Sequence, residues 1–434
     1  MIRFLSKNKQ VIAWSIYDFA NQPFTTLIVT FIFSAFFTEY LASDTQQGTY
    51  LWSLGISITA VFVALCSPIL GALADAGGYR KYFLMGASYL CIFATFCLYF
   101  FHPDQVFNLF GFNLDVAICA LITFIFANIG FEFGTVFCNS YLTDLSTSNN
   151  IGKVSGYAWG LGFIGGLISL AISLVFLDLT IVSHIRLVSL IVAVWFLVFS
   201  IPTFYYMSDK KSKGNVKKHF KQSLKSITLT FKNISQHKSI IRFLIARLFY
   251  NDALITIFAF GGIYAAGTLG FDFNEILLLG VMLNIAACIG SFLFGFLEDK
   301  IGVKKMLNIT LWSLIFSTLV AYLAPFLTTQ NHLINPKTLF WFAGIIIGLM
   351  QGPNQSGSRS LMARLTPENK KNEFFGFYAF SGKATAFIGP FLFGILTKFF
   401  DQQTGLLVVI VFFIIGLIIF QPLNLTSNNL NNGK

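Results

Sequence analysis

Charged residues are scarce in this sequence. Lys, Arg, Asp and Glu make up 11% of its 434 residues, whereas 56% are hydrophobic and the mean hydropathy is +0.73. Soluble globular domains carry about 25% charged residues, so this composition indicates a membrane protein. The length suits about twelve helical spans of roughly 20 residues joined by short loops.

Signatures of catalysis and of metal binding are also missing. The sequence has no Walker loop, no HExxH and no GxSxG, which disfavours an ATP-driven pump and leaves no catalytic constellation to support an enzyme. The five histidines are scattered in loops or at predicted helix ends, and the six cysteines lie in apolar runs without a CxxC pair. We therefore expect no metal site, no disulfide and no cofactor.

The hydrophobic runs predict an all-α polytopic membrane protein of twelve transmembrane helices. The predicted spans are 11–39, 50–75, 82–101, 115–138, 154–177, 186–207, 241–266, 275–297, 304–326, 338–360, 374–397 and 404–423. They divide into an N-terminal six-helix bundle (1–207), a linker (208–240) and a C-terminal six-helix bundle (241–434).

Basic residues gather on one side of these spans. The even-numbered connections hold Arg80, Lys81, Lys153, Lys300, Lys304, Lys305, Arg364, Lys370 and Lys371, together with the basic linker. The odd-numbered connections hold mainly Asp44, Asp104, Asp178, Asp272 and Glu275, with Arg186, Lys337 and Lys398 near their edges. By the positive-inside rule, both termini are expected in the cytoplasm and the membrane to be a cell inner membrane. The net charge of +11 then marks orientation toward anionic lipid rather than nucleic-acid binding.

The linker carries a helical apolar pattern. Its apolar residues recur every three or four positions: Val216, Phe220, Leu224, Ile227, Phe231 and Ile234. Lysines occupy the other faces: Lys217, Lys218, Lys221, Lys225 and Lys232. A basic amphipathic helix lying on the inner leaflet and tethering the two halves explains this pattern best.

The two halves repeat one another. The segment from Gly71 through Asp75 to Arg80 and Lys81 recurs as Gly295, Asp299, Lys304 and Lys305 after the eighth predicted span. Each copy reads G-x-L-x-D-x-x-G-x-[KR]-[KR]. Such an internal duplication in a membrane protein points to alternating access around a site between the halves.

These paired loops resemble motif A of the major facilitator superfamily. The resemblance implies that the loops hold the cytoplasmic gate closed, with gating residues Gly71, Asp75, Arg80, Lys81, Gly295, Asp299 and Lys304. The sequence departs from the motif at Ala76, where an arginine is common.

Other segments resemble one subfamily more narrowly. They are Trp14–Asn21, Gly130–Glu132 with Val136–Leu142, Tyr250–Asp252, Gln355–Leu365, and Phe374–Tyr378 with Ser381–Lys383. Together they are similar to the bacterial relatives of the fungal autophagy-related vacuolar amino-acid effluxers. This resemblance implies a secondary transporter, with amino acids as the leading substrate class.

The segment Gly348–Lys383 carries the strongest signal of a site. It begins in an apolar run and then presents Gln351, Pro353, Asn354, Gln355 and Arg359 where a lipid-facing helix would carry leucines. Polar groups at membrane depth usually face a bundle interior or water. We expect them to line a cavity; the alternative is a kinked helix whose polar residues only hydrogen-bond neighbouring helices.

Charged and amide side chains within spans form the candidate substrate or coupling site: Asp18, Asn21, Glu132, Asn139, Asp252, Asn354, Gln355, Arg359 and Lys383. At 1.5 Å per residue, Asp252 and Lys383 lie roughly 13–15 Å deep and Asp18 lies ~10 Å deep. The carboxylates either bind protons during transport or form permanent ion pairs with Lys383 or Arg359. The two cations either hold a substrate carboxylate or, for Arg359, reach the nearby interface, and Arg247 is a possible partner of Asp252.

The sequence thus predicts a secondary active transporter for a small organic solute, with an amino acid as the leading candidate and protons as the candidate coupling ion. Two alternatives remain open at this point. The cargo is another metabolite, such as a nucleoside, peptide or organic anion, or the protein is a non-transporting receptor on the same scaffold.

Overall fold

We describe the fold from a computed structural model. It describes residues 9–103, 105–109, 112–178, 181–209, 216–232, 237–330 and 335–423. Eleven helical segments in this part of the chain are long and apolar enough to cross a membrane. The chain is therefore a multi-pass membrane protein, and the predicted all-helical class is confirmed apart from one short hairpin.

The first half contains the elements from α2 to α9. They are α2 (Lys9–Pro23), η1 (Phe24–Phe31), α3 (Phe33–Phe36), η2 (Phe37–Leu41), α4 (Thr45–Gly77), α5 (Arg80–Leu98), β1 (Val106–Leu109), β2 (Phe112–Asp115), α6 (Val116–Ser140), α7 (Leu142–Leu145), α8 (Ile151–Phe176) and α9 (Val182–Tyr206). The strands pair antiparallel between α5 and α6.

The second half follows the linker helix α10 (Val216–Lys232). Its elements are α11 (Lys238–Leu269), α12 (Phe273–Ile301), α13 (Val303–Gln330), α14 (Pro336–Leu365), η4 (Glu368–Lys370), α15 (Lys371–Lys383), α16 (Ile388–Phe399) and α17 (Gln402–Phe420).

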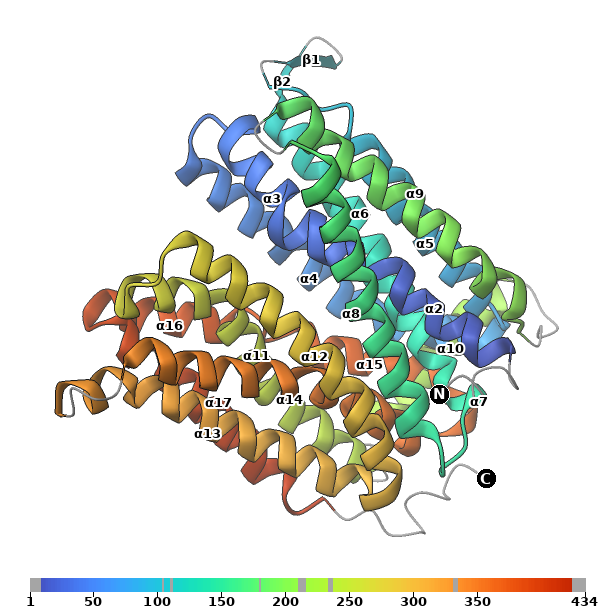
Figure 1. The fold of residues 1–434 in the computed structure, drawn as a ribbon. Coiled ribbons are helices and arrows are strands. Elements are labelled where there is room, and N and C mark those ends of the chain that lie inside the picture. Colours follow the sequence, from blue (N-terminus) through green and yellow to red (C-terminus); the bar gives the residue numbers. More distant parts are fainter. Residues whose placement is uncertain are drawn as a thin grey trace.

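The two halves lie side by side and meet at one end. In Figure 1, α2 to α9 occupy one side and α11 to α17 the other; the two sets converge near α2, α8, α12 and α15 and diverge toward α3 and α16. We call the convergent end the basic end, because Arg80, Lys153, Lys300 and Arg364 lie there. The hairpin β1–β2 projects from the opposite end (Figure 1).

Acidic and amide residues start the helices at the opposite end. Asp44, Asp115, Asp272, Asn335 and Asp401 each accept a hydrogen bond from a backbone amide in the first turn of the helix that follows. A side-chain cap satisfies an amide that otherwise has no partner in the helix. Asp44 and Asp272 of the odd-numbered connections thus have a structural role as helix caps.

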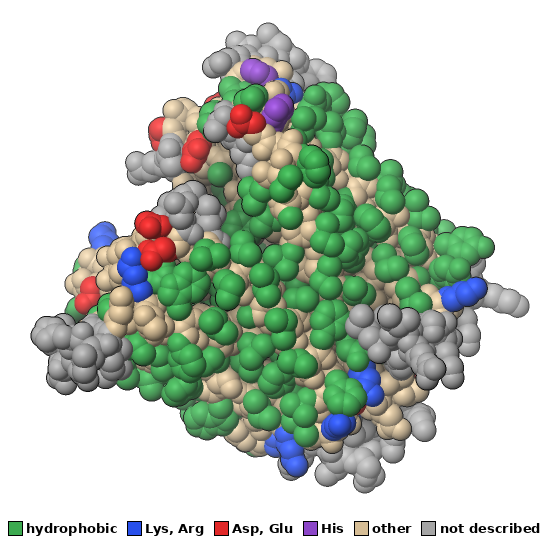
Figure 2. Space-filling view, in the orientation of Figure 1, with side chains coloured by type: hydrophobic (Ala, Val, Ile, Leu, Met, Phe, Trp, Pro, Cys, Tyr) green, Lys and Arg blue, Asp and Glu red, His purple; other side chains and the backbone are tan. Residues whose placement is uncertain are grey.

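Apolar side chains cover the outside of the bundle. Val61, Leu65, Phe93 and Ile201 are all more than half exposed, although a water-soluble protein would bury them. Figure 2 shows hydrophobic side chains over most of one face, with Lys and Arg gathered at its margins. This is the surface that a lipid bilayer covers.

Three spans differ from the sequence expectation. α14 runs unbroken for 30 residues through Pro353, although its polar second half keeps it out of the apolar set. The eleventh predicted span, 374–397, is broken, since α15 ends at Lys383 and α16 begins at Ile388. The first span is continued by π-helical turns after Pro23.

The linker helix does not lie free of the bundle. Its His219 and Ser223 are buried against the protein, whereas Phe220 and Leu224 are exposed. The predicted apolar stripe therefore points outward at Phe220 and Leu224, and its Ile227 is half-buried. The side chains of Val216, Lys217, Lys218 and Phe231, and all of Ile234, lie outside the described residues.

Candidate functional site

Two carboxylates from the repeated loops join the halves at the basic end. Asp75 of α4 accepts hydrogen bonds from the backbone amides of Asn372 (3.1 Å) and Glu373 (2.8 Å), at the start of α15. Asp299 of α12 accepts from the amides of Gly152 (2.9 Å) and Lys153 (3.1 Å), at the start of α8. Each half therefore caps a helix of the other half, where a negative charge also meets the positive end of the helix dipole.

The same loops allow the backbones to approach closely. A Cβ at Gly71 would lie 2.2 Å from the carbonyl oxygen of Asn372, and one at Gly376 would lie 2.4 Å from that of Ser67. In the second copy, a Cβ at Gly156 would lie 2.7 Å from the Cα of Gly295. We call these two contacts between the halves, α4 with α15 and α8 with α12, the seams. Any side chain at these glycines would force the seams apart.

Ion pairs surround these seams. The guanidinium of Arg80 pairs with Asp144 (2.7 Å) and lies 3.6 Å from the centre of the Tyr141 ring. Lys371 of the other half pairs with the same Asp144 (2.6 Å). In the second copy the cation comes from outside the repeated loop: Arg364 of α14 pairs with Glu298 of the loop at 3.4 Å.

Two of the proposed gating residues lie apart from the contact between the halves. The amide of Lys81 bonds the carboxylate of Asp209, which follows α9 in the same half. The Lys304 ammonium donates to the carbonyl oxygen of Gln421 at 2.7 Å, within its own half. The two copies of the motif are thus alike in their glycines and aspartates and unlike in their basic residues.

Arg359 makes the most extensive polar contact between the halves. From α14 it donates to Asp18 (2.8 Å) and Asn139 (3.1 Å), and to both the hydroxyl (3.0 Å) and the carbonyl oxygen (2.7 Å) of Ser155. Its side chain is 2% exposed and its guanidinium lies 4.8 Å from the Trp14 ring centre. The residue therefore binds three helices of the first half. It does not extend to the membrane–water interface, as an exposed arginine would.

Lys383 also pairs across the halves. Its ammonium, at the end of α15, lies 2.5 Å from a carboxylate oxygen of Glu132 on α6. Both side chains are partly exposed. The pair is less enclosed than that of Arg359 and Asp18, so its members are the more accessible to a solute or to water.

Asp252 has none of the expected cationic partners, which were Arg247, Arg359 and Lys383. One of its carboxylate oxygens accepts from the amide of Gly389 (3.1 Å), at the start of α16, and the other is buried with no hydrogen-bond partner. Arg247 does not pair with it; its guanidinium donates to Ser381 (2.9 Å) and lies over the ring of Tyr378. Asp252 therefore faces the break between α15 and α16.

The remaining predicted residues are placed as follows. Gln355 donates to Asn251 (3.1 Å) and Asn354 donates to Thr310 (3.2 Å) on α13, so Asn354 points away from the other half. Asn21 is buried on α2. The structure brings Asp18, Asn139 and Arg359 together and Glu132 and Lys383 together, and places Asp252, Asn354 and Gln355 against other partners.

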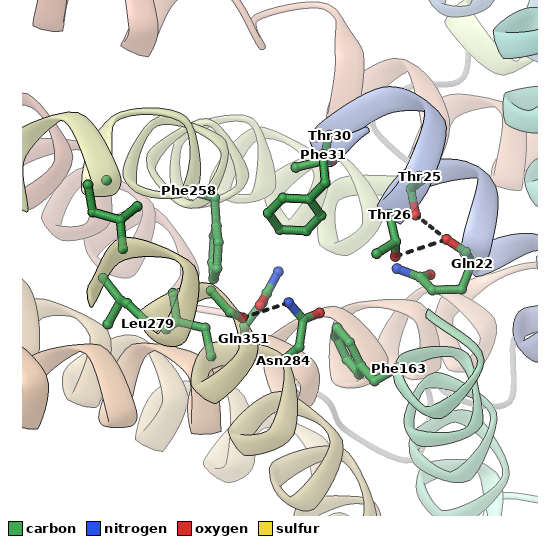
Figure 3. Close-up of a pocket in the computed structure, with 14 residues that line it drawn as sticks. Gln22, Thr25, Thr26, Thr30, Phe31, Phe163, Phe258, Leu279, Asn284 and Gln351 are labelled. Carbon is green, nitrogen blue, oxygen red and sulfur yellow. Dashed lines mark hydrogen bonds between the residues drawn. The ribbon is translucent and has the colours of Figure 1, made fainter. Parts of the chain in front are cut away.

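A cavity of about 330 Å³ opens between the halves toward the opposite end (Figure 3). Its polar lining residues are amides and hydroxyls: Gln22, Thr25, Thr26, Thr30, Asn284 and Gln351. Three phenyl rings, those of Phe31, Phe163 and Phe258, lie around them. No Lys, Arg, Asp or Glu among the described residues lines it.

The sequence reading did not identify most of this lining. The signal was present, because Gln22, Thr26 and Thr30 recur every four residues and so share one face of a helix. Pro23 has no amide to bond the carbonyl oxygen of Phe19, and Trp195 donates to that oxygen instead (3.1 Å). The π-helical turns of η1 follow at this point, and such turns are frequent at functional sites.

Asp18 and Arg359 lie beyond this cavity, toward the basic end. Asp18 lies one helical turn from Gln22, and Arg359 lies ~12 Å along α14 from Gln351 toward the basic end. Beyond them come the seams of Gly71 and Gly156. The cavity is therefore open toward one side of the membrane and closed toward the other.

A bundle of this kind, with a polar cavity between two repeated halves, is the architecture of a membrane transporter of the major facilitator type. Solved structures support this class. The xylose symporter XylE matches with a TM-score of 0.72 at 12% identity, over 95% of each chain. A bacterial homologue of the iron transporter ferroportin in its outward-facing state matches with a TM-score of 0.72 at 14% identity, over 96% of this chain and 98% of that one.

Within this class, the chain belongs to the family described as vacuole effluxer Atg22 like, whose model matches residues 50–431. It is 28% identical to the MFS-type transporter YxiO of Bacillus subtilis, which carries the word uncharacterized in its name, over 95% of this chain and 94% of that protein. Autophagy-related protein 22-1 of Aspergillus niger is 24% identical over 58% of this chain and 43% of that protein. The family and the fold are those of transporters rather than of enzymes, and the predicted resemblance is confirmed.

Proposed function

We propose that the protein is a secondary active transporter that carries a small organic solute, with an amino acid as the leading candidate, through the cytoplasmic membrane by alternating access. The observation that carries the proposal is the polar cavity that opens at one end while the paired seams close the other. We further propose that 1–207 and 241–434 move as two bundles joined by 208–240, and that the basic end and both termini face the cytoplasm.

The amino-acid assignment rests on the resemblance to vacuolar amino-acid effluxers, and the cavity chemistry is compatible with it. Amide groups such as those of Asn284 and Gln351 both donate and accept, so they can bind the carboxylate and the ammonium of a zwitterion. A cavity without charged lining residues suits a solute with no net charge.

A nucleoside is the second candidate cargo. The three phenyl rings of the lining favour it, because a base can pack against aromatic faces while its ribose bonds amides and hydroxyls. An organic anion fits less well, since the cations Arg359 and Lys383 already bind carboxylates of the protein.

We propose Asp252 as the first candidate for proton coupling. It has no cationic partner in the described structure, and one carboxylate oxygen is buried without a hydrogen bond. Proton uptake would remove an uncompensated buried charge and give that oxygen a donor. Glu132 and Asp18, each bound to a cation, would have to leave that cation first.

The test is flux of labelled amino acids in proteoliposomes, with and without a pH gradient. A gradient of one pH unit supplies about 1.4 kcal/mol per proton, enough for about tenfold accumulation. Asp252→Asn is expected to retain exchange of labelled for unlabelled solute and to lose the response to the gradient.

Asp401→Asn provides a matched control. The amide of Thr404 bonds the Asp401 carboxylate and holds its pKa below the usual range, so this exposed residue stays charged at neutral pH and asparagine keeps the helix cap. Gradient-driven accumulation that survives in Asp252→Asn would remove Asp252 from the coupling. Absence of flux for every amino acid tested would move the assignment to nucleosides.

A further inference from the structure

The linker helix α10 binds both halves at once. On the first half, the His219 imidazole hydrogen-bonds the hydroxyl of Tyr79 (2.9 Å), in the turn between α4 and α5. On the second half, Ser226 and Thr230 donate to the two carboxylate oxygens of Glu373 (2.6 and 2.5 Å). These residues and the buried Ser223 follow one another at spacings of three or four and so form one face of the helix.

This face is connected directly to the seam between the halves. Glu373 binds α10 through its side chain and Asp75 of the first half through its backbone amide. Its side chain is 1% exposed, and its buried charge is compensated by the hydrogen bonds from α10 together with the Lys370 ammonium, 4.0 Å away. When α4 and α15 separate, α10 cannot keep its contacts with both Tyr79 and Glu373.

The outer surface of α10 has a different chemistry. Phe220 and Leu224 are 47% and 44% exposed, and Lys221, Lys225 and Lys232 are exposed beside them. Every charged residue of the helix is a lysine. Apolar side chains flanked by lysines, at the level where the spans end, match the chemistry of an anionic bilayer surface: acyl chains for the phenyl and leucyl groups, phosphates for the ammonium groups.

We propose that anionic lipid headgroups bind the exposed face of α10 and thereby hold α10 across the halves, which favours the state closed at the basic end. The inference rests on the proposed alternating access, because only a protein that opens at this end has a second state to disfavour. The lipid acts here as a regulator at the surface and not as the transported solute.

Hydrogen–deuterium exchange of the purified protein in nanodiscs tests this proposal without transport or substrate. The amides of Asn372 and Glu373, bound to Asp75, report on the seam that α10 touches. Those of Gly152 and Lys153, bound to Asp299, report on the seam that α10 does not touch. Opening of the whole basic end exposes both pairs, whereas local fraying near α10 exposes only the first pair.

Changing the nanodisc from zwitterionic lipid to lipid with anionic phosphatidylglycerol is expected to slow exchange at both pairs by about fivefold or more, as each lysine near such a surface favours binding. Lys221→Gln/Lys225→Gln is expected to lose this lipid effect, and Lys305→Gln, an exposed lysine outside α10, to retain it. Ser226→Ala/Thr230→Val is expected to raise exchange at both pairs about tenfold in either lipid.

Several results would overturn the proposal. One is exchange that ignores the anionic lipid in the unmodified protein, and another is a lipid effect that persists in the double lysine variant. A lipid effect confined to the amides of Asn372 and Glu373 would show that only the region near α10 frays. Slower amide exchange on adding inorganic phosphate to zwitterionic nanodiscs would show that α10 binds a soluble anion rather than the anionic bilayer. Each of these outcomes leaves the flux of the solute as a separate question.

Discussion

Arg359→Ala is expected to reduce flux at least about 100-fold, because it removes the main polar contact between the halves and leaves the Asp18 carboxylate without its cation. Breaking a buried pair in this way costs about 3–5 kcal/mol, and 1.4 kcal/mol changes an equilibrium tenfold. The loss falls on the state in which the basic end is closed, so the protein should populate that state too rarely to take solute from the opposite side. Flux in proteoliposomes and exchange at the Gly152 and Lys153 amides measure the two effects.

Three further variants make this prediction specific. Arg242→Ala should have little effect, because that guanidinium is exposed and, among the described residues, donates to the carbonyl oxygen of Pro422 in its own half. Arg359→Lys keeps the charge but cannot make the forked contacts to Asp18, Asn139 and Ser155, so it should recover only part of the flux. Asp18→Asn added to Arg359→Ala should relieve part of the loss by removing the unpaired charge. Normal flux in Arg359→Ala would show that this contact does not determine the balance between the states.

The second large effect is expected at the α4–α15 seam. Gly71→Ala would place a methyl group 2.2 Å from the carbonyl oxygen of Asn372, and Gly376→Ala would place one 2.4 Å from that of Ser67. Backbone atoms can yield only by moving the helices apart, which costs about 1–3 kcal/mol or more. Each substitution should therefore lower flux by about tenfold to a hundredfold and raise exchange at Asn372 and Glu373.

Gly86→Ala is the matched control for both, because a Cβ at Gly86 would meet no atom within 4 Å. That variant should fold and transport normally, and the added methyl group should if anything favour the helix. If Gly71→Ala behaves like Gly86→Ala, then α4 and α15 need not approach this closely during transport.

The fold could be predicted because its signals are local and repeated. Long apolar runs mark the spans, and the two copies of the glycine–aspartate loop at Gly71–Asp75 and Gly295–Asp299 mark the duplication. The break after Lys383 has a local signal that the prediction of one continuous span missed: Pro390, in the first turn of α16, has no amide to bond the carbonyl oxygen of Ala386. A second stabilising contact is distant in sequence, since the Asp252 carboxylate bonds the amide of Gly389.

The site was predicted only in part, for a related reason. Charged residues in apolar runs are conspicuous, so the sequence singles out Asp18, Glu132, Arg359 and Lys383 as residues that must find partners or face water. Which partners they find depends on how the halves dock, and the pairs Asp18–Arg359 and Glu132–Lys383 are far apart in sequence. The cavity itself is lined by neutral residues such as Thr26 and Asn284, which stand out little in a membrane helix because hydroxyls and amides are common there.

The central claim is that the closed basic end must open in every transport cycle, and a reversible cross-link tests it most directly. Asp144 and Lys371 form an ion pair of 2.6 Å between the halves, so the variant Asp144→Cys/Lys371→Cys can be joined by a short, cleavable thiol-reactive linker. Glu275 and Lys337 form an ion pair of the same length within the second half, so Glu275→Cys/Lys337→Cys is the matched control. Flux is measured before linking, after linking and after cleavage.

Linking positions 144 and 371 is expected to stop flux and cleavage to restore it, whereas linking positions 275 and 337 is expected to leave flux unchanged. Undiminished flux with positions 144 and 371 linked would contradict alternating access through the basic end.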